Sequence, residues 1–118
     1  MISALHVLDE TERRTLAAYV ALLRERLGDN LVAIRVFGSV ARGERWWPGM
    51  PIRSDLDLLV LVREPLAPAV QQELLDATYP LFLQSGRQLG PQFRTEGQHL
   101  ASPSRESIDR DAIELALE

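Results

Sequence analysis

The sequence predicts an α/β or α+β domain in which a small mixed β-sheet is flanked by helices. Two observations predict it: an amphipathic helical repeat near the N-terminus, and two apolar runs at 31–37 and 55–62 that are bounded by turn residues. Strands interleaved with helices are typical of this class. The chain has 118 residues, near the common size of one domain, so we expect a single domain over residues 1–118.

The first predicted element is a helix that begins at a capping box. Asp9 and Glu12 have the spacing of such a box, with Asp as the N-cap residue. Apolar residues then recur at helical intervals as far as Gly28, a C-cap residue; they are Leu16, Tyr19, Val20, Leu23 and Leu27. Leu31–Phe37, apolar and partly β-branched, predicts a strand that ends at a glycine.

The middle of the chain predicts an irregular connection between two strands. Ser39 is a candidate N-cap for a short helix that runs to about Glu44. Arg45–Ile52 contains tryptophan, proline and glycine, and predicts a loop. Asp55–Val62 predicts the second strand.

The sequence of the C-terminal half predicts a further helix, a third strand, a short helix and a last segment that is either strand or helix. A helix follows Pro68, with Pro80 kinking or shortening its end; its apolar stripe is Val70, Leu74, Leu75 and Leu81. Leu89–Thr95 predicts a third strand and Ser104–Asp111 a short helix. Ala112–Leu117 is either a last strand or a continuation of that helix.

Composition excludes several classes of protein. Hydrophobic residues make up 46% and charged residues 25%, as in ordinary globular proteins. No apolar run approaches the roughly 18 residues of a membrane span, and Met1–Glu10 lacks the pattern of a secretory leader, so we expect a cytoplasmic protein without a membrane partner. The chain has no cysteine, which excludes disulfides and thiolate zinc sites.

Charge argues against direct nucleic-acid binding. The net charge is −4, so no broadly basic surface is expected. The segment 35–53 is locally basic, with four arginines against the single acid Glu44; they are Arg35, Arg42, Arg45 and Arg53. All basic residues are arginine, which excludes a P-loop because that motif needs lysine.

Asp55 and Asp57 open the second strand and predict a metal site. Side chains alternate along a strand, so both carboxylates share one face, about 7 Å apart. Two neighbouring carboxylates repel each other, and a divalent cation between them removes the repulsion. Magnesium prefers oxygen ligands and shares its remaining positions with substrate phosphates. The alternative is that Asp55-Leu56-Asp57 is only the solvated end of a strand.

Gly38 and Ser39 predict a phosphate-binding turn. Without a side chain on Gly38, backbone N–H groups can approach phosphate oxygens, and the Ser39 hydroxyl adds a donor at a helix start. The alternative is an ordinary turn that uses glycine for a positive φ.

Together these motifs resemble a known family. Phe37-Gly38-Ser39-Val40-Ala41-Arg42-Gly43-Glu44, followed by Ser54-Asp55-Leu56-Asp57-Leu58-Leu59-Val60, is similar to the signature of the minimal nucleotidyltransferases of the DNA polymerase β superfamily. The resemblance implies a nucleotidyltransferase fold and ATP as substrate. It also implies that Gly38, Ser39 and Arg42 bind the nucleotide, and that Asp55 and Asp57 are catalytic and bind Mg²⁺.

The same resemblance suggests a partner. Small members of the family commonly act as antitoxins beside a helical HEPN-domain toxin, and some transfer AMP from ATP to a tyrosine of that toxin. The alternatives are a protein that neutralises such a partner by binding with little or no catalysis, and an enzyme that modifies a small molecule, with a homodimer supplying the acceptor site.

Two features depart from the family pattern. Fifteen residues separate Ser39 from Asp55, more than in the compact antitoxin-type signature, so Arg45–Ile52 forms an extension. Active members usually carry a third carboxylate on a later strand, but Leu89–Thr95 contains no acid; the nearest candidate is Glu96.

The tryptophans, two arginines and the histidines have expected roles of their own. Trp46 and Trp47 either pack within the extension or contact a base or a partner. Arg53 either pairs with a neighbouring carboxylate or reaches a phosphate, and Arg35 lies at a sheet edge, snorkels or pairs with an acid. Two histidines, His6 and His99, are expected to take no part in the site.

Both faces of the second strand are apolar. Leu58, Val60 and Val62 lie on one face, and Leu59 and Leu61 continue the face of the two acids. We therefore expect another subunit or a partner protein to cover part of the active-site face of this strand.

Overall fold

The computed structural model describes residues 8–38 and 55–115. Its elements in chain order are α1 Glu10–Leu27, the short 3₁₀ helix η2 Gly28–Asn30, β1 Leu31–Phe37, β2 Leu56–Val62, α3 Pro68–Asp76, α4 Thr78–Ser85, β3 Leu89–Thr95, α5 Glu96–Leu100, α6 Arg105–Asp111 and β4 Ile113–Glu114. The predicted short helix from Ser39 and the loop Arg45–Ile52 lie outside the described residues. No helix within the described ranges is long and apolar enough to cross a membrane.

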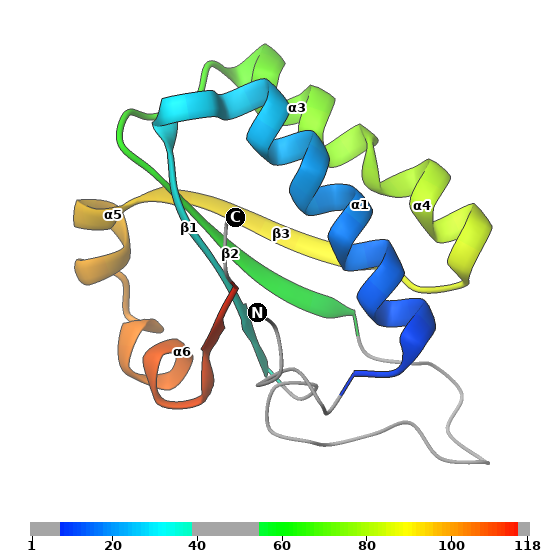
Figure 1. The fold of residues 1–118 in the computed structure, drawn as a ribbon. Coiled ribbons are helices and arrows are strands. Elements are labelled where there is room, and N and C mark those ends of the chain that lie inside the picture. The colour runs from blue at the N-terminus through cyan, green and yellow to red at the C-terminus, as the bar shows by residue number, and fades with distance from the viewer. Residues whose placement is uncertain (1–7, 39–54, 116–118) are drawn as a thin grey trace.

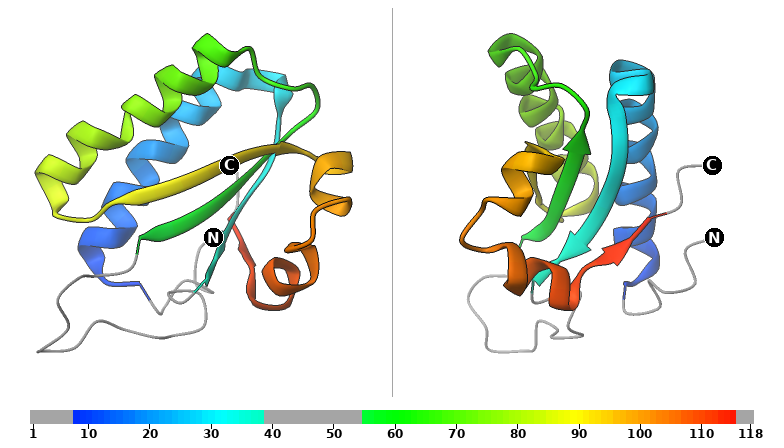
Figure 2. Two further views of the ribbon diagram at one scale, coloured as in Figure 1. Left: turned by 180° about the vertical axis from the view of Figure 1, so that it is seen from behind. Right: turned by 90° about the vertical axis from the view of Figure 1, so that its left-hand side faces the viewer.

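The four strands form one mixed sheet in the order β3-β2-β1-β4. β1 pairs antiparallel with both β2 and β4, whereas β2 and β3 run parallel. Helices α1, α3 and α4 lie over one face, and α5 and α6 lie over the other (Figures 1 and 2). The predicted fold class, a small mixed sheet flanked by helices, is confirmed.

Helix α1 forms as the sequence predicts, because its capping box and its apolar stripe agree. The Asp9 carboxylate accepts from the Glu12 backbone N–H at 2.8 Å, and Glu12 Oε1 accepts from the Asp9 N–H at 3.0 Å. The stripe is buried against the sheet. Tyr19 is fully buried, and its hydroxyl donates to the Leu74 carbonyl of α3 at 2.7 Å, which joins the two helices.

Strand β2 is the centre of the molecule and is covered on both faces by the chain itself. Leu58, Val60 and Val62 pack in the larger core cluster beneath α1 and α3. Leu59 and Leu61 are also buried, in a smaller cluster with Ile108 of α6. The apolar side chains for which we expected cover from another subunit or partner are thus buried by the chain itself, because α5 and α6 provide a second helical layer that the periodicity of the sequence did not reveal.

The predicted helix after Pro68 is two helices, α3 and α4, which meet at Ala77. Thr78 begins α4 and its hydroxyl donates to the Leu75 carbonyl at 2.8 Å. Pro80 then lies in the first turn of α4, where its missing N–H costs no hydrogen bond. The proline thus lies in the first turn of a second helix and does not kink the end of the first.

The C-terminal elements decide between a strand and a helix for the last residues, and they include one helix that the sequence did not predict. Helix α6 lies where the sequence predicted it, and the residues after it form the short strand β4, which pairs with β1. Helix α5 was not predicted. A capping box starts it, since Thr95 accepts from the Gln98 N–H and the Gln98 side chain accepts from the Thr95 N–H.

Candidate functional site

Gly38 and Asp57 meet at the end of the sheet where β1 ends and β2 begins. Phe37, the last residue of β1, is the Cα partner of Asp57, so Gly38 follows directly beside that carboxylate. Gly38 has φ +79°, and a β-carbon placed on it would overlap Asp57 Oδ2 and lie 3.2 Å from the carboxyl carbon. This position therefore favours glycine for its left-handed backbone, and a β-carbon here would oblige the end of the Asp57 side chain to shift.

The two acids share one face of the sheet, as the alternation of the strand predicts. A β-carbon placed on Gly90 of β3 would lie 3.5 Å from Asp57 Oδ1 and 3.6 Å from Asp55 Oδ2. Asp55 is exposed and Asp57 is half-buried. We call Asp55 and Asp57 the acidic pair.

Gly90 is a site residue that the sequence analysis missed. It is the Cα partner of Asp57 across the parallel ladder, so Asp57 has a glycine from each neighbouring strand beside it. Gly90 is not among the glycines with positive φ, so its backbone does not demand glycine. The available signal was a glycine inside a predicted strand, which often marks the close approach of a ligand or another chain.

The third carboxylate of the family pattern is not found at Glu96. Glu96 follows Thr95, the partner of Val62 at the far end of β2. Glu96 lies six positions beyond Gly90, a distance of about 20 Å along an extended strand. Within residues 8–38 and 55–115 no three or more acidic or histidine side chains form a group that could hold a metal ion. The place beside both acids is taken by Gly90 instead.

The remaining predicted site residues are not described by the structure. Ser39 and Arg42, the other expected nucleotide contacts, lie in the segment 39–54, as do Arg53, Trp46 and Trp47. The candidate site therefore consists, in its described part, of Gly38, the acidic pair and Gly90.

A buried ion pair anchors the strand that carries Gly90. Arg87 Nε donates to Glu12 Oε2 at 2.7 Å, with the two side chains 5% and 2% exposed. The next residue, Gln88, accepts the Leu56 N–H on its carbonyl at 2.9 Å, which aligns the starts of β2 and β3. The N-terminus of α1 thus fixes where β3 begins, and with it the position of Gly90 beside the acidic pair.

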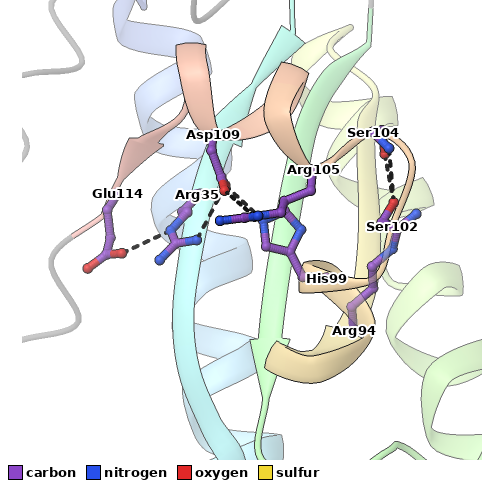
Figure 3. A network of polar contacts seen from close by, with 8 residues as sticks. All are labelled: Arg35, Arg94, His99, Ser102, Ser104, Arg105, Asp109 and Glu114. Atoms are coloured by element: carbon purple, nitrogen blue, oxygen red, sulfur yellow. Dashed lines mark hydrogen bonds and ion pairs between the residues drawn. The ribbon is translucent and has the colours of Figure 1, made fainter.

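A polar network supports the same face of the sheet farther from its end (Figure 3). Asp109 of α6 accepts from His99 Nε2 at 2.8 Å and lies 3.9 Å from Arg35 and 3.5 Å from Arg105. The His99 hydrogen bond, together with the nearby positive charges, lowers the pKa of the Asp109 carboxyl. Arg35 also pairs with Glu114 of β4 at 3.0 Å.

This network is structural. It ties α5, α6 and β4 to β1, which confirms the alternative in which Arg35 pairs with an acid. His99 is buried, with 2% of its side chain exposed, and acts as a link between the two short helices.

The acidic pair has the chemistry of a magnesium site. Carboxylate oxygens are hard donors, and two of them on one face provide ligands on one side while leaving the other side for substrate oxygens. Gly38 brings a backbone without a side chain into contact with one of these carboxylates. The residues therefore fit a divalent cation.

Comparisons with known proteins agree with the fold. No family model and no curated protein sequence matches the chain. Among solved structures, one assigned as a minimal nucleotidyltransferase is 34% identical; the match covers 90% of this chain and 94% of the other, with a TM-score of 0.57.

Two toxin–antitoxin structures are more distant. One holds a tri-AMPylated HEPN toxin of Shewanella oneidensis with its MNT antitoxin; the match is 16% identical, covers 89% of this chain and 71% of the other, and has a TM-score of 0.54. A toxin–antitoxin structure with AMP-PNP matches at 17% identity over 87% of this chain and 71% of the other, again with a TM-score of 0.54. At these identities the likeness shows the shared fold.

Proposed function

The chain belongs to the minimal nucleotidyltransferases, and we propose that it transfers AMP from ATP to a hydroxyl group of a partner protein. The observation that carries the proposal is the acidic pair, Asp57 in β2 and Asp55 just before it on the same face, beside a glycine with a positive φ. The likeness to the AMP-PNP complex supports a nucleoside triphosphate as the substrate.

Each residue of the site has a role in this reaction. Asp55 and Asp57 hold the magnesium ion, which when bound neutralises charge that develops on the phosphate oxygens. Gly38 exposes its backbone to the triphosphate, and Ser39 and Arg42 donate to it. The acceptor oxygen attacks the α-phosphorus, the bond to the β-phosphate breaks, and pyrophosphate leaves with the bonding electrons. The hydroxyl proton passes to solvent.

The proposed acceptor is a helical toxin of the HEPN class, so that transfer makes the protein an antitoxin. Support comes from the structure in which an MNT antitoxin accompanies an AMPylated HEPN toxin.

The experiment is a transfer assay with ATP labelled at the α-phosphate, magnesium and the protein encoded by the adjacent reading frame. The label is expected on a hydroxyl side chain of that protein, located by mass spectrometry, and is expected to disappear when EDTA removes the magnesium. A wild-type preparation that binds the partner but leaves it unlabelled under these conditions overturns the proposed transfer.

A second candidate function is neutralisation of the same kind of partner by binding alone. It is favoured by one observation: no group of three acids is found among the described residues, and Gly90 stands beside the acidic pair. In the same assay this function gives a stable complex and a neutralised toxin without label. An Asp57→Asn variant would then neutralise the partner as well as the wild type.

A further inference from the structure

A buried ion pair is connected to the backbone of the acidic pair. Arg87 Nε donates to Glu12 Oε2 at 2.7 Å, and both residues are buried. The carbonyl of the next residue, Gln88, accepts the Leu56 N–H at 2.9 Å. Leu56 is the residue between the two members of the acidic pair. The ion pair is therefore one residue and one hydrogen bond away from the peptide that joins the two acids.

Both partners of the ion pair are also held by their own helices. Glu12 Oε1 accepts the Asp9 N–H at 3.0 Å, so one carboxylate caps α1 and binds Arg87. The Arg87 N–H donates at 3.0 Å to Ser85 Oγ, on the last residue of α4. The pair thus ties the first turn of α1 and the end of α4 to the start of β3.

Stability alone does not explain why such a pair is buried. Removing two charges from water costs about as much as their attraction returns, and well-packed apolar residues often replace a buried pair without loss. What the pair adds is geometry, because its donor and acceptor must align at hydrogen-bond distance. Between α1 and β3 this alignment fixes where Gln88 presents its carbonyl to Leu56.

Position matters at the acidic pair because of the metal that it fits. Mg²⁺ requires nearly octahedral geometry with oxygen ligands at about 2.0–2.1 Å, whereas Ca²⁺ accepts oxygen ligands at about 2.3–2.6 Å in flexible arrangements. A small shift of the backbone between two carboxylates should therefore weaken Mg²⁺ binding more than Ca²⁺ binding.

We propose that Glu12 and Arg87 are positioning residues for the magnesium site: their buried ion pair holds the backbone of the acidic pair where both carboxylates meet the geometry that Mg²⁺ requires. They act through Gln88 and Leu56 and not by contact with the cation. The inference rests on the proposed function, in that it takes the acidic pair as the metal site.

The test is the double variant Glu12→Gln/Arg87→Met, which removes one negative and one positive charge and so keeps the net charge. Glutamine retains a side-chain oxygen that can cap α1. Titrations with Mg²⁺ alone and with Ca²⁺ alone, followed by the amide NMR signals of Leu56 and Gly90, measure both affinities. We expect the affinity for Mg²⁺ to fall at least about tenfold and that for Ca²⁺ to change by less than about threefold, since Ca²⁺ tolerates displaced ligands.

Glu73→Gln/Arg26→Met is the matched control. It makes the same two substitutions in an exposed ion pair that joins the other end of α1 to α3. Both metal affinities should stay at the wild-type values. Glu12→Gln alone is measured if the double variant fails to fold, as judged by circular dichroism and thermal unfolding. Its changed net charge affects both metals alike, so the ratio of the two affinities still reports the geometry.

The outcomes separate the positioning role from the proposed function. Unchanged affinity for both metals in the folded double variant overturns the positioning role and leaves the metal site in place. An equal loss for both metals shows that the pair acts on the whole fold, and this also overturns the positioning role. A wild type that binds Mg²⁺ but transfers no AMP overturns the proposed function, while the two metal affinities still decide the positioning role. A wild type that binds neither metal overturns both.

Discussion

Replacing Gly38 with alanine tests whether close approach to Asp57 explains the glycine. The substitution places a β-carbon on a residue with φ +79°, which for an alanine costs about 1–2 kcal/mol. The same β-carbon overlaps Asp57 Oδ2, so the carboxylate must move. Displacing the end of this side chain from its preferred rotamer adds about 0.5–1.5 kcal/mol.

Gly86→Ala isolates the first of these two effects. Gly86 follows α4 with φ +71°, and a β-carbon placed on it meets nothing within 4 Å. It therefore suffers the backbone strain without the steric overlap. We expect Gly38→Ala to be less stable than Gly86→Ala by about 0.5–1.5 kcal/mol, the cost of the displaced Asp57 rotamer.

Urea unfolding followed by circular dichroism measures the stability of both variants, and isothermal titration calorimetry measures their affinity for ATP with magnesium. Gly86→Ala should bind ATP as the wild type does. Gly38→Ala should bind at least about tenfold more weakly, because the displaced carboxylate no longer presents its oxygens to the cation. Equal stability and equal ATP affinity in the two variants would refute the reasoning.

Two further predictions concern the scaffold of the site. Arg87→Met leaves the carboxylate of Glu12 buried without this partner and should lower the free energy of unfolding by about 3–5 kcal/mol in a urea titration. Arg26→Met breaks an exposed pair and should cost less than about 1 kcal/mol, so an equal loss in both would contradict the burial argument. Asp109 has a lowered pKa in the folded state, so its contribution to stability is present above the ordinary aspartate value of about 3.9 and is lost as the pH falls through its lower folded value. Asp109→Asn should therefore flatten the acid limb of a stability-against-pH curve, and an unchanged slope would show that the carboxylate is not stabilised by folding.

Local patterns in the sequence were sufficient to predict α1, β1 and β2, the elements around Gly38 and the acidic pair. The capping box and the apolar stripe predicted α1, and the apolar runs predicted β1 and β2. The alternation of β2 predicted that Asp55 and Asp57 share a face, which the contacts of Gly90 bear out.

What the sequence could not supply depends on pairing between distant segments. Gly90 comes beside Asp57 only through the register of the parallel strands β2 and β3, which no local pattern encodes. His99 is buried because α5 and α6 bring it to Asp109, ten residues away. The second helical layer follows from the same short helices, which is why β2 is covered without a partner.

The most direct test of the central claim is the rate of AMP transfer to the partner protein by Asp57→Asn, measured beside the wild type by intact mass spectrometry. Asparagine keeps the shape of the side chain next to Gly38 and Gly90 but removes the charge that binds magnesium. The wild type should add one adenylate to the partner in a magnesium-dependent reaction, and Asp57→Asn should be slower by at least about 100-fold while remaining folded. Transfer at the wild-type rate by the folded variant would contradict the assignment of the acidic pair.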